Sequence, residues 1–338
     1  MSELRQDRTT GAWVIIAPER RDRPQRRIET ARATQPRPGF DLHCPFCPGN
    51  EAMLPGILEE VPVDRAPGWQ VRVVPNKYPV LRADTAMAQP PRHGGVAMAG
   101  YGHHDVVIES PRHDADLASM SDGEIEAVLA AYHRRFVWLS EQPRIQRVIL
   151  FRNYGPTRGA SLAHPHAQLV ALAMTPPDLQ AHAARARSWH EHHGQCDLCD
   201  EMALERADGR RVVEETESFT ALVPFAATCP FEVWLVPRRH QASFAEIERG
   251  ELGEMGLFLR DVLCRLKSVL GDPPYNFVVD SAGPMELGRP DLHWRVRIAP
   301  GLATPGGFEL ATGMSINPSS PEGDAPALRN AEGYAPCP

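Results

Sequence analysis

Apolar positions along the chain fall into two series of strands and helices. In the first series, the segments "RVVPN", "HDVVIES", "RVILFRN" and "HAQLVALAM" are predicted to be strands. Apolar residues recur at helical spacing in "DGEIEAVLAAYHRRFVWLSEQ", and "GELGEMGLFLRDVLCRLKSVL" is the corresponding helix of the second series. The linker "TPPDLQAHAARARSWHEHHGQ" begins with a Pro-Pro stop and is predicted to be helical beyond it, with its histidine cluster on a solvated face rather than at a metal.

The two series repeat one order of motifs. Each contains a C-x-x-C pair, an apolar strand, a proline, an Arg-His dipeptide and an amphipathic helix, and then reaches a further histidine on a strand. We therefore predict two pseudo-repeats as domains, residues 1–180 and residues 181–321. Residues 322–338 are rich in proline, glycine and alanine and are predicted to form a mobile tail.

Length, composition and charge limit the class of protein. A chain of 338 residues with 42% hydrophobic and 23% charged residues can fold into two domains with ample cores. The net charge of -7 argues against a general nucleic-acid binder. No apolar run approaches the roughly 20 residues that span a bilayer, and the N-terminus has no apolar signal core, so a cytoplasmic location is expected.

One segment, "PERRDRPQRRIETARATQPRPG", is locally basic and rich in proline. It is either a solvated loop or a phosphate clamp in which Arg20 and Arg23 supply bidentate donors. The sequence alone does not separate these alternatives.

The two C-x-x-C pairs predict metal sites. Thiols stay reduced in the cytoplasm, and neither pair opens a strand-to-helix unit of the thioredoxin kind. Each repeat offers two thiols and two imidazoles, the ligand set of a closed, tetrahedral structural zinc site. The alternative is that the late histidine of either repeat lies on the surface. The predicted sites are Cys44, Cys47, His113 and His164, and Cys196, Cys199, His240 and His293.

The stretch "HPHAQ" predicts phosphorus chemistry beside the first metal. Alternation places His164, His166 and Gln168 on one face of a strand, although an ordinary polar sheet face would show the same spacing. If His164 binds zinc, His166 remains free, and a neutral imidazole is a good nucleophile toward phosphorus. Gln168 can donate a hydrogen bond to a charged intermediate but cannot titrate, which favours transfer between phosphates.

Several ordered motifs resemble the galactose-1-phosphate uridylyltransferase family of the histidine-triad superfamily. They are "CPFC", "VRVVPNKYPVL", "VVIESPRHDADL", "FRNYGPTRGASLAHPHAQ" and "GGFELATGMSINPSSPE", and the match runs from about Trp13 to about Pro321. The resemblance implies an α+β protein with two tandem histidine-triad-like domains, each an antiparallel sheet with packed helices. It also implies a ping-pong reaction in which the second histidine of H-P-H carries a nucleotidyl intermediate.

The resemblance also implies roles for single residues. It makes His166 the nucleophile and Gln168 the donor to the phosphoryl oxygens. The remaining positions are a phosphate-contacting loop of Asn153, Gly159 and Ser161, and a nucleotide-holding set of Asn76, Arg20 and Arg23.

Two departures from the family pattern concern the second repeat and the substrate. Where relatives commonly have a histidine two residues beyond His293, this chain has Arg295, which is expected to meet a phosphate. With cysteines supplied, the second site is more similar to the branch that contains ADP-glucose phosphorylase. Ala311 and Ser315 stand where relatives often have a glycine and an aromatic residue, in the segment that resembles the sugar-phosphate contact and reaches the partner subunit in dimeric relatives.

We therefore predict a nucleotidylyltransferase that moves a nucleoside monophosphate from UDP-glucose to a hexose 1-phosphate through His166. The nearest alternative is ADP-glucose phosphorylase, with inorganic phosphate as acceptor, and a transferase of secondary metabolism is another. An alternative of a different class is a nucleotide-binding protein without turnover, against which the retained His166 and Gln168 argue. We expect two structural zinc ions per chain, a nucleotide sugar with a sugar 1-phosphate or phosphate as partners, no nucleic acid, no membrane, and a homodimer.

Overall fold

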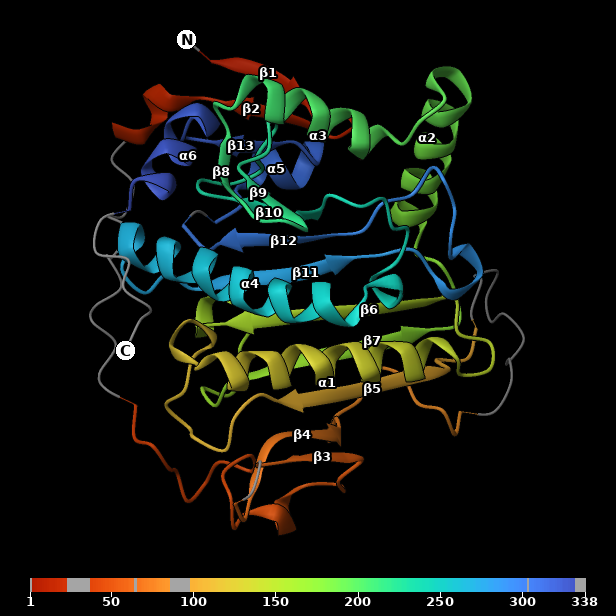
Figure 1. The fold of residues 1–338 in the computed structure, drawn as a ribbon, viewed down its shortest axis with the longest axis vertical. Helices are drawn as coiled ribbons and strands as arrows, with labels where there is room; N and C mark the ends of the chain where they lie inside the picture. The colour runs from red at the N-terminus through yellow and green to blue at the C-terminus, as the bar shows by residue number, and fades with distance from the viewer. Residues whose placement is uncertain (1, 23–36, 64–65, 86–97, 303, 332–338) are drawn as a thin grey trace.

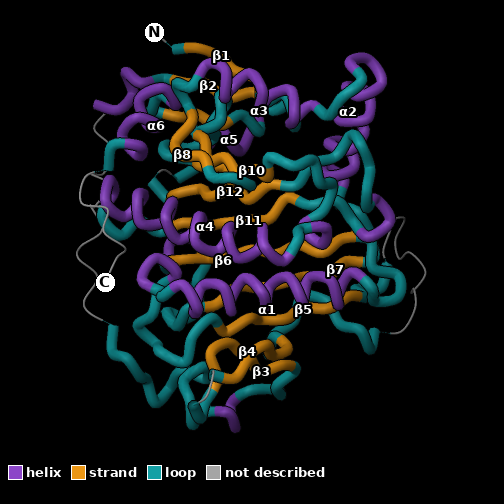
Figure 2. Tube along the Cα trace, in the orientation of Figure 1, coloured by secondary structure: helices purple, strands orange, loops and turns teal. Residues whose placement is uncertain are grey.

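The computed structural model describes residues 2–22, 37–63, 66–85, 98–302 and 304–331. Most strands of these residues join one ten-stranded sheet, and a smaller three-stranded sheet lies near the N-terminus (Figure 1). Figure 2 shows the strands of the large sheet stacked in one continuous layer behind two long helices.

The large sheet is built from two sets of five strands, and the order of the second set along the sheet is the reverse of the first. Its order is β3-β4-β5-β7-β6-β11-β12-β10-β9-β8, so β6 of the first half pairs antiparallel with β11 of the second. The two half-sheets that the sequence predicts are therefore one sheet joined at their edges, and each half has the same strand order from its outer edge to the seam. The strands are β3 (Glu59–Pro62), β4 (Trp69–Pro75), β5 (Gly102–Ile108), β6 (Arg147–Tyr154), β7 (His166–Leu172), β8 (Val212–Glu215), β9 (Phe219–Leu222), β10 (Val233–Pro237), β11 (Tyr275–Asp280) and β12 (Arg295–Pro300).

Two equivalent helices cover one face of this sheet. They are α1 (Asp122–Ser140) and α4 (Arg249–Leu270), which pack on each other and bury apolar residues against the strands. Ser121 caps α1 through a capping box with Glu124, which explains where the predicted helix begins. The opposite face of β5, β7 and β6 is left for the polar residues of the candidate site.

The other helices lie toward the ends of the sheet. The linker helix that the sequence predicts after the Pro-Pro stop is confirmed as α2, and it ends at Gly194 with a φ of 79°. The α-helices are α2 (Pro177–His193), α3 (Asp197–Asp208), α5 (Gly307–Thr312) and α6 (Pro321–Arg329), and the 3-10 helices are η1 (Pro18–Asp22), η2 (Glu51–Met53), η3 (Leu117–Ser119), η4 (Pro156–Arg158), η5 (Phe244–Glu246) and η6 (Pro284–Glu286). None of the helices in the described ranges is long and apolar enough to cross a membrane.

The small sheet ties the start of the chain to its C-terminal region. It contains β1 (Glu3–Gln6), β2 (Trp13–Ile16) and β13 (Ser315–Asn317), with β13 parallel to β2.

The prediction of a mobile tail from residue 322 was wrong for its first part. Residues 321–329 form α6, whose Ala325 and Leu328 are fully buried in the main core. Glu322 also binds Arg5 and Arg211. The composition of this segment concealed two apolar positions at helical spacing, and residues 332–338 lie outside the described part of the chain.

Candidate active site and metal clusters

His166 is the first residue of β7, on the face of the sheet opposite α1. Its Cα partner on β5 is Ile108, and Gln168 pairs with Val106, so the two side chains share that face. The residues between and beyond them, Ala167 and Leu169, turn into the core under α1. The predicted row of polar groups is therefore confirmed for His166 and Gln168, while His164 lies just before the strand.

The tautomer of His166 follows from its neighbours. Its Nδ1 lies 2.8 Å from the carbonyl oxygen of His164, and a carbonyl oxygen can only accept, so Nδ1 carries the proton and donates it. Burial lowers the pKa of His166, and the charge of Arg152 adds to the effect. The neutral ring thus keeps a free lone pair on Nε2. The ring of Phe46 packs against it with centroids 5.4 Å apart and helps to exclude water.

The first cysteine and histidine cluster has the geometry of a zinc site. The Sγ of Cys47 lies 3.4 Å from Nδ1 of His113 and 3.6 Å from Nδ1 of His164, and the Sγ of Cys44 lies 3.7 Å from the latter. Tetrahedral zinc with ordinary Zn–S and Zn–N bonds separates such ligands by roughly 3.6 Å. His164 Nε2 donates to the carbonyl of Ser110 at 2.7 Å, which leaves Nδ1 as the ligand atom. All four residues are buried, so the donor set fits a closed structural ion.

The second cluster is similar but more exposed. The Sγ of Cys199 lies 3.3 Å from Nδ1 of both His240 and His293, and with Cys196 the four ligand atoms lie within 4.8 Å of one another. His240 Nε2 donates to the carbonyl of Arg289 at 3.1 Å. His240 is exposed and Cys199 half-buried, whereas Cys196 is buried. This donor set also fits zinc, at a place that solvent reaches.

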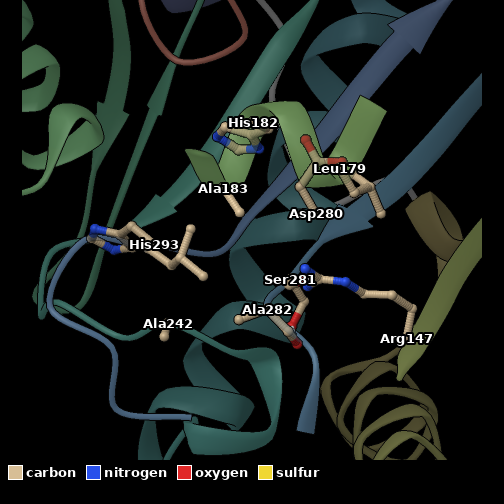
Figure 3. A pocket seen from close by; sticks show the side chains of 10 residues that line it. Arg147, Leu179, His182, Ala183, Ala242, Asp280, Ser281, Ala282 and His293 are labelled. Atoms are coloured by element: carbon tan, nitrogen blue, oxygen red, sulfur yellow. Dashed lines mark hydrogen bonds between the residues drawn. The ribbon is translucent and has the colours of Figure 1, made fainter. Parts of the chain in front are cut away.

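A small cavity lies beside the second cluster. Figure 3 shows His293 at one side of it, with His182 and Ala183 of α2 above and Asp280 opposite. Its volume is about 30 Å³, enough for a water molecule, whereas small-molecule sites have roughly 300 Å³ or more. This cavity is therefore too small for a nucleotide.

Gln168 and Asn76 both meet a histidine that sequence reasoning missed. The Nε2 of His104, on β5, lies 2.8 Å from Oε1 of Gln168 and 3.0 Å from Nδ2 of Asn76. Asn76 also accepts from the N–H of Tyr78 at 2.8 Å, which shapes the turn after β4. The structure thus brings the predicted Asn76 and Gln168 together, and the period-two pattern of "HHDVVIES" could have placed His104 on their face.

The predicted phosphate loop lies between β6 and β7, next to His166. Nδ2 of Asn153 donates to the carbonyl of Gly159 at 3.4 Å, and Ser161 is exposed on the loop. Gly159 has a φ of 86°, a conformation that other residues rarely adopt. Asn276 of β11 donates to Oδ1 of Asn153 and to the carbonyl of Arg158, at 2.8 and 2.9 Å. The second half therefore holds the loop of the first, which no sequence signal predicts.

The structure places the predicted arginines apart from this face or outside the described residues. Arg20 lies in η1 and Arg23 lies outside the described part of the chain. Arg295 was expected to meet a phosphate, but its side chain is 2% exposed. Its guanidinium lies near Asp280, donates to Thr9 and stacks on Trp234. The position that corresponds to His166 in the second half is thus filled by a buried ion pair, and Arg295 has no exposed face for a ligand.

Comparisons with known proteins agree with this geometry. Residues 1–176 match the family model "Galactose-1-phosphate uridyl transferase, N-terminal domain", and residues 180–278 match the corresponding C-terminal domain. The chain is 35% identical to ADP-glucose phosphorylase of Arabidopsis thaliana over 97% of this chain and 92% of that protein. It is 28% identical to galactose-1-phosphate uridylyltransferase of Thermotoga maritima over 98% of this chain and 99% of that protein.

Solved structures extend the comparison to the fold. The structure of an Arabidopsis thaliana ADP-glucose phosphorylase with bound ADP-glucose superposes with a TM-score of 0.84 at 32% identity, covering 99% of this chain and all of that one. A structure of a uridylyltransferase superposes with a TM-score of 0.75 at 27% identity, covering 98% of each chain. The chain therefore belongs to the galactose-1-phosphate uridylyltransferase family of nucleotidyltransferases, as its ordered motifs indicated.

Proposed function

We propose that His166 is the nucleophile of a nucleotidyl transfer from a nucleotide sugar to a second phosphate. The observation that carries the proposal is the hydrogen bond from Nδ1 of His166 to the carbonyl of His164, at 2.8 Å. It fixes the tautomer and directs the unprotonated Nε2 away from the backbone, on the face that also carries Gln168. A nucleophile with a lone pair at neutral pH and a neutral donor beside it is what phosphoryl exchange requires.

The two half-reactions balance without an external acid or base. Nε2 of His166 forms a bond to the α-phosphorus of the donor, and the bond from that phosphorus to the bridging oxygen breaks. The electron pair of the broken bond leaves with the sugar 1-phosphate, whose phosphate needs no proton at neutral pH. A phosphate oxygen of the acceptor then attacks the same phosphorus, and the P–N bond breaks to restore neutral His166. Nδ1–H stays on the His164 carbonyl throughout and stabilises the positive charge that the ring gains.

We propose zinc as the ion of both clusters. Cys44, Cys47, His113 and His164 would hold one ion, and Cys196, Cys199, His240 and His293 the other. Four protein ligands leave a zinc ion no open position for water, so its contribution is to hold the chain in place. In the first cluster, this fixes His164, whose carbonyl orients His166.

The residues around His166 are proposed to bind the donor. Asn153, Gly159 and Ser161 would contact phosphates, since their loop ends at the strand that carries His166. Asn76 would hold the nucleotide, because it lies beside His104 at the edge of the same face. Nucleotide-holding roles for Arg20 and Arg23 stay predictions, as do the homodimer and the cytoplasmic location.

Two donors are candidates. Uridylyl transfer with UDP-glucose as donor and a hexose 1-phosphate as acceptor is the first candidate, because the family's description names a galactose-1-phosphate uridyl transferase. Adenylyl transfer from ADP-glucose to inorganic phosphate is the second candidate, because the Arabidopsis thaliana ADP-glucose phosphorylase is more similar to this chain than the Thermotoga maritima uridylyltransferase, at 35% against 28% identity. That difference makes ADP-glucose the donor to test first.

Isotope exchange tests the proposal. The chain is incubated with unlabelled ADP-glucose or UDP-glucose and labelled glucose 1-phosphate, without any other acceptor. A covalent intermediate predicts that the label enters the nucleotide sugar, and the donor that exchanges identifies the base. A direct transfer between two bound substrates predicts no exchange under these conditions. Tight donor binding without exchange would indicate the binding protein instead.

A further inference from the structure

The orientation of the Gln168 amide decides whether this residue helps or hinders an anion. A terminal amide can turn either its NH2 group or its oxygen toward a phosphoryl group, and only the NH2 group stabilises negative charge. Gln168 projects from β7 on the same face as His166, but its position in the strand does not select one orientation. A neighbouring group must select it.

His104 is placed to do so. Its Cα partner on β7 is Val170, so its side chain lies on the Gln168 face, and it is 8% exposed. The N–H of Val80 donates to Nδ1 of His104 at 3.2 Å. Because a backbone N–H can only donate, Nδ1 is unprotonated and the neutral ring carries its proton on Nε2. Burial lowers the pKa of His104 despite the Gln168 contact and Asp105, which supports the neutral form.

The proton on Nε2 has one acceptor among its neighbours in the described part of the chain. Oε1 of Gln168 lies 2.8 Å away, whereas the atom of Asn76 at 3.0 Å is the amide nitrogen, which is itself a donor. The oxygen of that amide, Oδ1 of Asn76, already accepts from the N–H of Tyr78. The Gln168 oxygen is therefore held by His104, and its NH2 group has no acceptor within the described ranges.

We infer that His104 is a positioning residue that holds the Gln168 oxygen and thereby turns the amide NH2 toward the phosphoryl group on His166. The inference rests on the proposed function and names a group that nothing in the family motifs assigns. His104 is itself held by Val80, and it touches Asn76, so the turn that follows β4 is connected to the strand that carries the nucleophile. Placement of the nucleotide and orientation of Gln168 would thus depend on one imidazole.

A double-mutant cycle separates this role from a structural one. The rate of nucleotidyl-His166 formation is measured for wild type, His104→Phe, Gln168→Ala and the double variant, with ADP-glucose and with UDP-glucose. Loss of one oriented hydrogen bond predicts a rate about 10-fold lower for His104→Phe. If His104 acts through Gln168, the double variant is no slower than Gln168→Ala alone. An equal further loss in the Gln168→Ala background would overturn the inference.

Two further variants sharpen the test. His104→Gln keeps an N–H near the position of Nε2 and is expected to recover most of the lost rate. His103→Phe is the matched control, since His103 points to the other face of β5 and packs on Trp138, with centroids 5.8 Å apart. Its rate is expected to equal that of wild type, and failure of both expectations would contradict the assigned role.

The imidazole nitrogens of the wild-type chain give a readout that does not need turnover. Nitrogen NMR of His104 is expected to show the Nε2–H tautomer, and an Nδ1–H tautomer or a charged ring would overturn the inference. If wild type forms no nucleotidyl adduct with either donor, the proposed function fails, while the tautomer still decides whether His104 can donate to Gln168. The two failures are therefore distinguishable.

Discussion

Asn276 donates its Nδ2 to Oδ1 of Asn153 at 2.8 Å, across the seam where the two halves of the sheet meet. The same NH2 group donates to the carbonyl of Arg158 at 2.9 Å, so one side chain of the second half holds the start and the middle of the proposed phosphate loop. This contact connects the second half to the proposed phosphate loop of the first, although the second half's own equivalent of His166 is Arg295.

Replacement of Asn276 should slow the reaction without unfolding the chain. Asn276→Ala removes both hydrogen bonds and is expected to lower the rate of nucleotidyl transfer about 10-fold. Asn276→Asp should lower it further, because a carboxylate would face the Asn153 oxygen and the Arg158 carbonyl. Asn330→Ala, at the exposed end of α6, is the control. Unchanged rates in both Asn276 variants would show that the loop needs no support from the second half.

Removal of the nucleophile should abolish transfer and spare the fold. His166→Gly is expected to lower the rate of transfer by at least about 1,000-fold, since covalent catalysis cannot proceed without the imidazole. Circular dichroism and the unfolding temperature are expected to remain close to those of wild type. A variant that still turns over at the wild-type rate would end the covalent mechanism.

Metal analysis should find about two zinc ions per chain, and a chelator should remove one of them before the other. The second cluster is expected to lose its ion first, because His240 is exposed, whereas all four residues of the first cluster are buried. Cys44→Ser should lower the free energy of unfolding by several kcal/mol, roughly 3–5, because structural zinc contributes directly to folding. Cys199→Ser should lower it less. A metal-free chain of unchanged stability would contradict both assignments.

The ion pairs of Glu322, which hold α6 on the rest of the fold, should make the free energy of unfolding fall in acid. Burial opposes ionisation of Glu322, but the hydrogen bonds from Arg5 and Arg211 prevail and lower its pKa from 4.5 to about 2. A lowered folded-state pKa stabilises the fold above about pH 4.5, and this contribution is lost as the pH falls toward 2.

The matching measurement is denaturant unfolding between pH 2 and pH 6. Glu322→Gln should be less stable than wild type near neutral pH by about 1–2 kcal/mol, after allowance for solvent screening of a partly exposed group. The difference should shrink in acid. Glu191→Gln, at an exposed site on α2, should show no such dependence. A constant difference across the range would mean that the Glu322 charge does not hold α6.

The sequence predicts the parts of this fold that depend on local pattern. The strands around "VVIES" and "HAQLVAL", the two core helices and both metal clusters follow from period-two and helical spacing and from repeated C-x-x-C and histidine motifs. These elements can be recognised because the spacing of apolar residues, or the type of the ligand residues, lies within one short segment.

The sequence does not predict the contacts between distant parts of the chain. Nothing local shows that β6 pairs with β11, because either edge of each half-sheet could have joined the other. The burial of Arg295 could not be predicted for the same reason, since Thr9 and Trp234 reach it from remote segments. His104 escaped notice because a lone histidine on a strand has no signature until its neighbours are known.

The most direct test of covalent transfer through His166 is the intact mass of the chain after brief incubation with ADP-glucose or UDP-glucose and no acceptor. A covalent intermediate on His166 predicts an acid-labile gain of one nucleoside monophosphate, absent in His166→Gly, and the donor that gives it identifies the base. No gain from either donor, with saturable binding of at least one, would contradict covalent catalysis and indicate a nucleotide-binding protein.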